Sequence, residues 1–213
     1  MKCNSDCPLC GGAGWCETDE GMMLCPNTPL DYTGTGVDEA DRNVPGLLPK
    51  TKILSVMGAA LKSLRDKGYG MLWLQGDYGI GKTVLAKAAT VEAYNQYGAV
   101  LYTRQMEMIN TLRAAMFTGD NGQALLLSRK ADITKVKWLV VDEIGRINQT
   151  PFSDETMGEI IDTRYHMALK ESAMTVLISN DAPEKSLQPY LVDRIRDTKM
   201  KVLVAEGKSL RKG

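Results

Sequence analysis

The sequence predicts an α/β fold built on a doubly wound parallel sheet. Short apolar runs alternate with longer stretches of helical periodicity from residue 53 onwards, and these runs are too continuously apolar for half-exposed strands. One of the first runs ends in a glycine-rich loop with the spacing G-x-x-x-x-G-K-T at residues 76–83. A strand, such a loop and a helix, followed by further alternation, are typical of a parallel sheet with helices on both faces.

The composition fits one sizeable core with a small appendage, since 44% of the 213 residues are hydrophobic. The chain does not begin with a charged and apolar leader, and no apolar run reaches membrane length. We therefore expect a cytoplasmic protein with no membrane partner. The first 42 residues hold eight acidic and two basic side chains, which leaves 18 acidic and 24 basic side chains for the rest. A modestly basic body is compatible with nucleic-acid binding but does not establish it.

Five strands and four helices are expected along the chain. The strands cover residues 71–74, 99–102, 136–141, 174–178 and 202–204. Apolar residues at helical spacing predict helices over residues 53–67, 82–97 and 106–117. A fourth helix is expected to begin with Ser153 as its N-cap and to run to about Ala168. Residues 118–134 show no clear pattern.

The glycine-rich loop predicts a nucleoside triphosphate site. Its glycines let the backbone turn so that successive N–H groups face phosphate oxygens, and the helix that begins near Lys82 adds its positive N-terminal end. Lys82 is expected to reach the β- and γ-phosphates, and the hydroxyl of Thr83 to ligate Mg²⁺. The predicted nucleotide-binding residues are Gly76, Asp77, Tyr78, Gly79, Ile80, Gly81, Lys82 and Thr83.

Polar residues follow the third and fourth expected strands, at the edge of the sheet where the loop lies. We expect Asp142 to hold Mg²⁺, directly or through water, and Glu143 to polarise the attacking water. This acidic pair favours hydrolysis over passive binding. Asn180 ends the next strand, where its amide is placed to hydrogen-bond the γ-phosphate or the lytic water, although Ser-Asn is also an ordinary turn sequence.

Arg194 and Arg196 are candidates for a further catalytic role. Phosphoryl transfer gains from an arginine that meets the transition-state charge, often from a neighbouring subunit. The alternative is a helical surface on which Arg196 pairs with Asp193 or Asp197. Taken without the rest of the chain, these residues favour the second interpretation.

All five cysteines lie in the first 25 residues. Clustered thiols in a reducing compartment favour a metal site over disulfides. Cys7 and Cys10 form a C-x₂-C knuckle, in which two thiolates bind one zinc ion across a tight turn, and Cys25 is the expected third ligand. Unmetallated thiols are the alternative, because the sequence has no second C-x₂-C pair.

The fourth zinc ligand is either Cys3 or Cys16. If residues 13–18 and 21–25 form a hairpin, a rise of ~3.3 Å per residue carries Cys16 well away from the knuckle, whereas Cys3 can fold back over it. The favoured ligand set is therefore Cys3, Cys7, Cys10 and Cys25.

Together the motifs resemble the AAA+ ATPases of the DnaC/DnaI helicase-loader and IstB group. The matching segments are GDYGIGKT (76–83), WLVVDEIG (138–145), EIIDTRY (159–165), VLISN (176–180) and LVDRIRD (191–197). The resemblance covers about residues 50–213 and extends to the closing Gly207-x-Ser209-x-Arg211. It implies a P-loop ATPase core without a C-terminal helical lid.

The resemblance also implies roles and partners. ATP and Mg²⁺ are the implied cofactors, Asn180 is the implied sensor of the nucleotide, and Arg194 is the implied arginine finger, with Arg196 as its rival. Members of the group form nucleotide-dependent rings or helices and bind single-stranded DNA. The cysteine knuckle resembles N-terminal zinc modules that grip the helicase, but it departs from the commoner pattern because Cys25 has no paired cysteine.

The expected chain thus has a zinc-binding module over residues 1–30, a linker over residues 31–50 and an AAA+ ATPase domain over residues 51–213. The favoured function is an ATP-dependent loader, of the kind that phages and prophages carry, which delivers a hexameric replicative helicase to single-stranded DNA. The alternative is an IstB-like transposition ATPase that wraps duplex DNA and engages a transposase; the short acidic zinc module favours the loader. A third hypothesis, a zinc adaptor with a nucleotide switch and negligible turnover, conflicts with the intact acidic pair.

Overall fold

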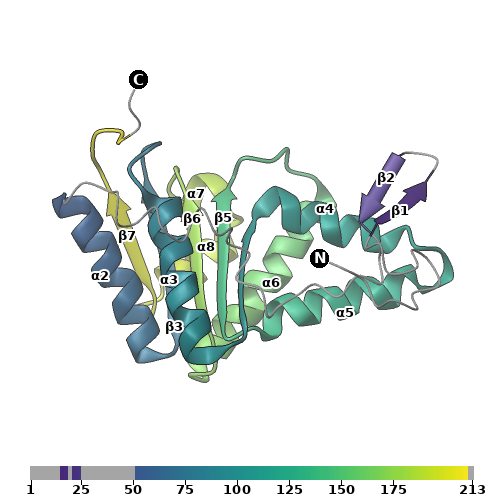
Figure 1. Cartoon of the computed structure of the whole chain (residues 1–213), viewed down its shortest axis with the longest axis horizontal. Helices are drawn as coiled ribbons and strands as arrows, with labels where there is room; N and C mark the ends of the chain where they lie inside the picture. The colour runs from purple at the N-terminus through teal and green to yellow at the C-terminus, as the bar shows by residue number, and fades with distance from the viewer. Residues whose placement is uncertain (1–14, 19–20, 25–50, 211–213) are drawn as a thin grey trace.

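Five parallel strands form the central sheet, in the order β4-β5-β6-β3-β7 (Figure 1). The structure, a computed structural model, describes residues 15–18, 21–24 and 51–210. Each predicted strand is present, and the parallel α/β fold is confirmed. The strands are β3 (Gly70–Gly76), β4 (Val100–Arg104), β5 (Trp138–Ile144), β6 (Met174–Ser179) and β7 (Lys201–Ala205).

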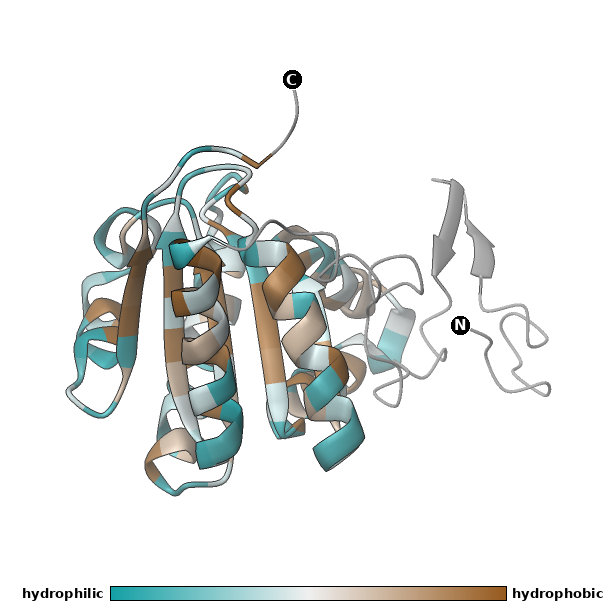
Figure 2. Ribbon diagram, turned by 60° about the vertical axis from the view of Figure 1, so that its left-hand side comes forward, coloured by the Kyte–Doolittle hydropathy of each residue, from teal (hydrophilic) through white to brown (hydrophobic). Residues whose placement is uncertain are grey.

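Helices cover both faces of this sheet (Figures 1 and 2). Leu72 and Leu74 of β3 pack with α2 and α3 on one face, whereas Met71 and Trp73 pack with α4, α5, α6 and α8 on the other. Alternate side chains of one strand therefore enter two cores, which is why its sequence is continuously apolar. The helices are α2 (Lys52–Lys67), α3 (Lys82–Tyr97), α4 (Gln105–Met116), η2 (Gly119–Asn121), α5 (Gly122–Lys135), α6 (Pro151–Leu169), α7 (Pro183–Ser186) and α8 (Pro189–Arg196).

The start of α6 differs from the prediction. Thr150, not Ser153, is the N-cap, and Pro151 is the first helical residue. The Thr150 hydroxyl accepts a 3.2 Å bond from the Ser153 N–H, and the Ser153 hydroxyl accepts a 2.8 Å bond from the Thr150 N–H. Ser153 is therefore the third residue of a capping box, in which both residues satisfy backbone donors that the helix itself leaves unpaired.

Arg164 of α6 ties this helix to the starts of β5 and β6. Its buried guanidinium donates a 2.8 Å bond to the Thr175 hydroxyl and further bonds to the carbonyls of Thr134, Val136 and Met174. Burial lowers the pKa of Arg164 to about 9, so the group is still charged at neutral pH. These four acceptors offset the cost of burying the charge and fix the end of the sheet opposite the strands' carboxyl ends.

The N-terminal residues that the structure describes form the expected hairpin. β1 (Trp15–Thr18) pairs antiparallel with β2 (Gly21–Leu24), and Cys16 lies opposite Met23. The other four cysteines, Cys3, Cys7, Cys10 and Cys25, lie outside the described residues, so the zinc site and the module and linker boundaries stay predictions. Within the described ranges, no group of three or more His, Cys, Asp or Glu side chains could hold a metal ion. No helix in that part of the chain is long and apolar enough to cross a membrane.

Candidate nucleotide-binding site

A pocket of about 210 Å³ lies at the carboxyl ends of β3, β5 and β6. In parallel α/β sheets this edge is where ligands bind, because the loops that leave the strands there diverge. β6 separates β3 from β5 in the sheet, so Asn180 enters the pocket between the phosphate loop and the acidic pair. The lining residues are Tyr78, Gly79, Gly81, Lys82, Thr83, Val84, Asp142, Glu143, Arg146, Ile178, Ser179, Asn180 and Leu210.

The loop between β3 and α3 requires glycine at its two ends. Gly76 and Gly81 have φ values of 157° and 96°. A Cβ on Gly76 would lie 2.1 Å from the carbonyl oxygen of Ala205, and one on Gly81 would lie 2.7 Å from Leu54 Cδ2. Any other residue would force the backbone out of this shape. The loop then leads directly into α3, whose positive N-terminal end faces the pocket.

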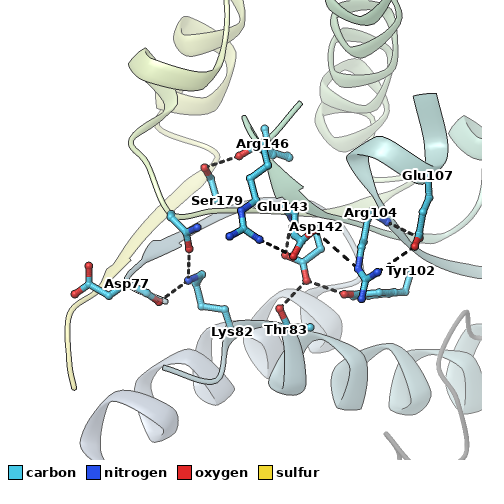
Figure 3. A network of polar contacts seen from close by, with 12 residues as sticks. Asp77, Lys82, Thr83, Tyr102, Arg104, Glu107, Asp142, Glu143, Arg146 and Ser179 are labelled. Atoms are coloured by element: carbon cyan, nitrogen blue, oxygen red, sulfur yellow. Dashed lines mark hydrogen bonds and ion pairs between the residues drawn. The ribbon is translucent and has the colours of Figure 1, made fainter. Parts of the chain in front are cut away.

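The Lys82 ammonium lies inside the loop (Figure 3). Its Nζ donates to the carbonyl oxygens of Gly76 at 2.7 Å and Asp77 at 2.8 Å, and to Asn180 Oδ1 at 3.0 Å. Burial lowers the pKa of Lys82, while the charges of Asp142 and Asp77 act in the opposite direction. All three partners are neutral oxygens, so charged phosphate oxygens can replace them and form stronger, charge-assisted hydrogen bonds with the ammonium.

The carboxylate of Asp142 accepts three hydrogen bonds, and the residue is almost fully buried (Figure 3). Its Oδ2 accepts 2.7 Å bonds from the hydroxyls of Thr83 and Tyr102, and its Oδ1 accepts one from the Glu143 N–H. Burial, reinforced by the Asp142 charge, raises the pKa of Tyr102, which therefore stays a donor. A buried carboxylate next to the Thr83 hydroxyl is a suitable pair of oxygen ligands for Mg²⁺.

Glu143 sits in an irregular turn of the strand. The β5–β6 register shifts between Val141 and Ile144, and Glu143 has φ 58°, a region that non-glycine residues rarely adopt. Such bulges re-aim side chains beside active sites. Here the Glu143 carboxylate borders the pocket and accepts a 2.8 Å bond from Arg146, whose guanidinium lies 4.8 Å from the centre of the Tyr78 ring.

The two candidate arginine fingers do not line this pocket. Arg194 Nε lies 3.0 Å from Asp162 Oδ1, and Arg196 makes bonds of 2.9 and 2.7 Å to Glu184 Oε1. Both acidic partners come from other helices, not from the neighbouring Asp193 and Asp197. The structure thus brings together the loop, Asp142, Glu143 and Asn180 in one pocket, while both arginines are paired elsewhere on the same chain.

Several residues of the site were not predicted from the sequence, and Tyr102, Arg146 and Leu210 are the ones that matter most here. Tyr102 was predicted only as part of a strand, and Arg146 had no predicted role. Leu210 lies within the closing Gly207-x-Ser209-x-Arg211 pattern, which gave it no role in the site. The signal for Arg146 was its position three residues after Glu143. No local signal identifies Tyr102 or Leu210, because each reaches the site only through tertiary structure.

A family model described as IstB-like ATP binding protein matches residues 54–212. A curated relative, an ATP-binding protein of insertion sequence IS232 from Bacillus thuringiensis subsp. berliner, is 26% identical over 144 residues. That match covers 68% of this chain and 52% of the relative, so the chain spans about half of the relative's length.

Solved structures share the fold. The DnaC helicase loader superposes with a TM-score of 0.62 at 18% identity, over 79% of this chain and 99% of that one. DnaI gives a TM-score of 0.59 at 18% identity, over 81% and 91%. AMPPCP-bound DnaA from Aquifex aeolicus gives 0.61 at 20% identity, over 75% of this chain and 48% of that one. The fold is therefore the AAA+ P-loop core, and the chain belongs to the IstB-like ATP-binding protein family.

Proposed function

We propose that this chain is a Mg²⁺-dependent ATPase. The observation that carries the proposal is the convergence of Lys82, Thr83, Asp142, Glu143 and Asn180 on one pocket, from three neighbouring strand ends. A protein that only held a nucleotide would need the loop and the lysine. The buried carboxylate beside Thr83 and the second carboxylate at the mouth of the pocket are what hydrolysis requires in addition.

Each side chain has a task in this reaction. Lys82 leaves the carbonyls of Gly76 and Asp77 and binds the β- and γ-phosphates. Thr83 and Asp142 would hold Mg²⁺, which would supply positive charge to the phosphates. Glu143 orients the attacking water, and Asn180, already bonded to Lys82, turns its amide to the γ-phosphate.

We further propose that ATP turnover drives the loading of a hexameric replicative helicase onto single-stranded DNA. The set of motifs from the phosphate loop to LVDRIRD supports this proposal, as does the fold shared with the DnaC helicase loader and with DnaI. In this proposal the chain assembles into a nucleotide-dependent ring or helix, and the N-terminal zinc module grips the helicase.

A specific observation favours a second candidate. The curated relative belongs to an insertion sequence, and the family model is IstB-like, which supports a transposition ATPase that acts with a transposase on duplex DNA. A pulldown from the host followed by mass spectrometry separates the two functions. We expect the pulldown to recover a replicative helicase. We also expect the protein to speed the entry of that helicase onto closed circles of single-stranded DNA. Recovery of a transposase instead would replace the loader proposal.

The ATPase proposal itself is tested at Lys82 and Glu143. Lys82→Ala should abolish tight ATP binding, because it removes the charge that meets the phosphates.

Glu143→Gln should bind ATP normally but turn over about 100-fold more slowly, since it keeps the shape of the side chain and loses the base. Wild-type turnover by Glu143→Gln would contradict the catalytic assignment. Negligible turnover by the wild-type protein, even with DNA, would point to a nucleotide switch.

A further inference from the structure

The segment after β7 returns to the phosphate loop and covers it. The Leu210 N–H donates a 2.9 Å hydrogen bond to the carbonyl oxygen of Gly79. Leu210 Cδ1 lies 3.7 Å from the position that a Cβ on Gly81 would take. Together with the Ala205 carbonyl against Gly76, these contacts place one continuous segment against the start, middle and end of the loop. Figure 1 shows this segment, in yellow, curving over the carboxyl edge of the sheet.

A second contact fixes the path of the segment. A Cβ on Gly207 would lie 3.4 Å from Ile53 Cδ1, so the chain passes close to the first turn of α2. Three residues later the hydrogen bond to Gly79 anchors the backbone again. Leu210 is itself this second anchor, and its half-buried side chain lines the pocket.

The polarity of the pocket indicates which part of a nucleotide Leu210 would meet. Lys82, Thr83 and Asp142 determine where the β- and γ-phosphates bind, on the side of the loop that faces β5 and β6. The nucleoside must extend away from these groups, past the loop, and Leu210 lines the pocket from the segment that covers the loop. Ligand pockets typically offer apolar surface to the flat, weakly polar part of a ligand and reserve polar groups for its charges.

We propose that Leu210 contacts the nucleoside of bound ATP, so that residues 206–210 form a wall of the nucleotide site. The proposal rests on the ATP site proposed above. Leu210 contributes apolar surface to the base or ribose and nothing to the phosphates. It therefore determines affinity for the nucleoside part alone, which makes it separable from the phosphate loop by experiment.

The test compares ATP with inorganic tripolyphosphate, which carries the three phosphates without a nucleoside. Both ligands are titrated calorimetrically, with Mg²⁺, into the full chain and its variants. Leu210→Ala should bind ATP about tenfold more weakly, the effect of losing roughly 50 Å² of apolar contact. Its tripolyphosphate affinity should stay within about twofold of wild type. Leu210→Met, which keeps the apolar surface, should bind both ligands as wild type does.

Two further variants complete the test. Val204→Ala is the matched control, because Val204 lies on β7, is 51% exposed and lines no part of the pocket; its affinities should not change. Leu210→Asn keeps the size of the side chain and should repeat the Leu210→Ala result if alanine impairs folding. Equal losses for ATP and tripolyphosphate would overturn the proposal, since Leu210 would then only shape the loop. Unchanged ATP affinity would also overturn it. Failure of wild type to bind either ligand would refute the ATP site itself.

Discussion

Glu143 Oε1 accepts a 2.8 Å hydrogen bond from Arg146 Nη1, and Arg104 Nε lies 4.0 Å from the other oxygen of the same carboxylate. The group that we propose to orient water is therefore paired with cations in this structure (Figure 3). The Glu143 and Arg146 side chains are about 40% exposed (39% and 43%), and exposed ion pairs contribute only about 0.2–1 kcal/mol. Such a pair restrains the carboxylate but can open during each catalytic cycle.

Removal of Arg146 should therefore free Glu143. We expect Arg146→Ala to raise the basal ATPase rate at saturating ATP and Mg²⁺ by about two- to fivefold, the factor that corresponds to an exposed ion pair. Steady-state phosphate release measures it. Arg113→Ala is the control, because Arg113 lies against the Phe152 ring and lines no part of the pocket. A lower rate for Arg146→Ala would show that Arg146 assists ATP directly instead of restraining Glu143.

Tyr102→Phe tests the support of the proposed Mg²⁺ ligand. The variant removes one of two hydroxyl donors to Asp142 Oδ2 and leaves the ring in place. Groups that orient a metal ligand typically contribute 10- to 100-fold in metal affinity, so the Mg²⁺ concentration for half-maximal turnover should rise about tenfold. The rate at saturating Mg²⁺ should change little.

The matched control is Tyr97→Phe. The Tyr97 hydroxyl lies at the opposite end of α3 from the loop, where it donates a 2.8 Å bond to the carbonyl oxygen of Arg65 and accepts a 3.0 Å bond from Gln96 Nε2. This variant therefore loses hydrogen bonds only outside the site. If both variants shifted the Mg²⁺ dependence equally, the effect would reflect a general loss of stability, and Tyr102 would have no specific role at the metal.

The sequence predicted the strands well because their signal is local. Residues such as Trp73 and Trp138 lie in runs buried on both faces, and both side chains are fully buried. The helix α5 was not predicted, because its apolar residues do not share one face. In the run Leu125-Leu126-Leu127, Leu126 is buried and Leu127 is 56% exposed. The apolar residues of α5 therefore show no clear helical periodicity in the sequence, although Leu126 and Ile133 lie in the same core as the buried residues of α4.

Those contacts of the site that join the phosphate loop to a neighbouring strand end could be predicted from the sequence. The Thr83–Asp142 contact follows from a loop and a strand end at one edge of the sheet. The Tyr102 contact does not, because it depends on the β4–β5 register, which places Arg104 opposite Asp142 and Tyr102 two residues earlier on the same strand. Nor could a sequence show that Arg194 pairs with Asp162, 32 residues away on another helix.

The zinc prediction concerns the cysteines near the N-terminus and needs a metal measurement. Protein purified without chelator should contain one zinc ion per chain, and a chelator should remove it without changing ATP binding by the body. Cys16→Ser should retain the metal and Cys3→Ser should lose it. The reverse result would exchange these two residues in the ligand set. Metal-free wild-type protein would leave the cysteines as unmetallated thiols.

Arg194 is the favoured candidate for an arginine finger, and Arg196 is its rival. The Arg194 Nε bonds to Asp162, and the Arg194 guanidinium lies 4.9 Å from the centre of the Tyr165 ring. Arg196, by contrast, makes two bonds to Glu184 through Nε and Nη2. With 38% of its side chain exposed and its Nε bonded to Asp162, Arg194 lies at the surface of the chain.

If Arg194 completes a neighbour's site, the interface is head-to-tail, which builds rings or open helices. ATPase activity per chain should then rise with protein concentration and with single-stranded DNA, which gathers subunits along its backbone. Arg194→Ala should bind ATP normally and lose most of this stimulation, about 100-fold or more at full assembly. Arg196→Ala is the matched control and should keep it.

Mixing two defective variants gives the decisive measurement. Lys82→Ala chains are expected not to bind ATP but carry an intact Arg194, whereas Arg194→Ala chains are expected to bind ATP but lack the proposed finger. In mixed assemblies some Arg194→Ala sites face an intact neighbour, so hydrolysis should return in part and peak at intermediate ratios. If no ratio restores hydrolysis and activity does not depend on concentration, Arg194 acts only as the surface partner of Asp162. That result would also weaken the loader proposal, because a loader of this type works as an assembly.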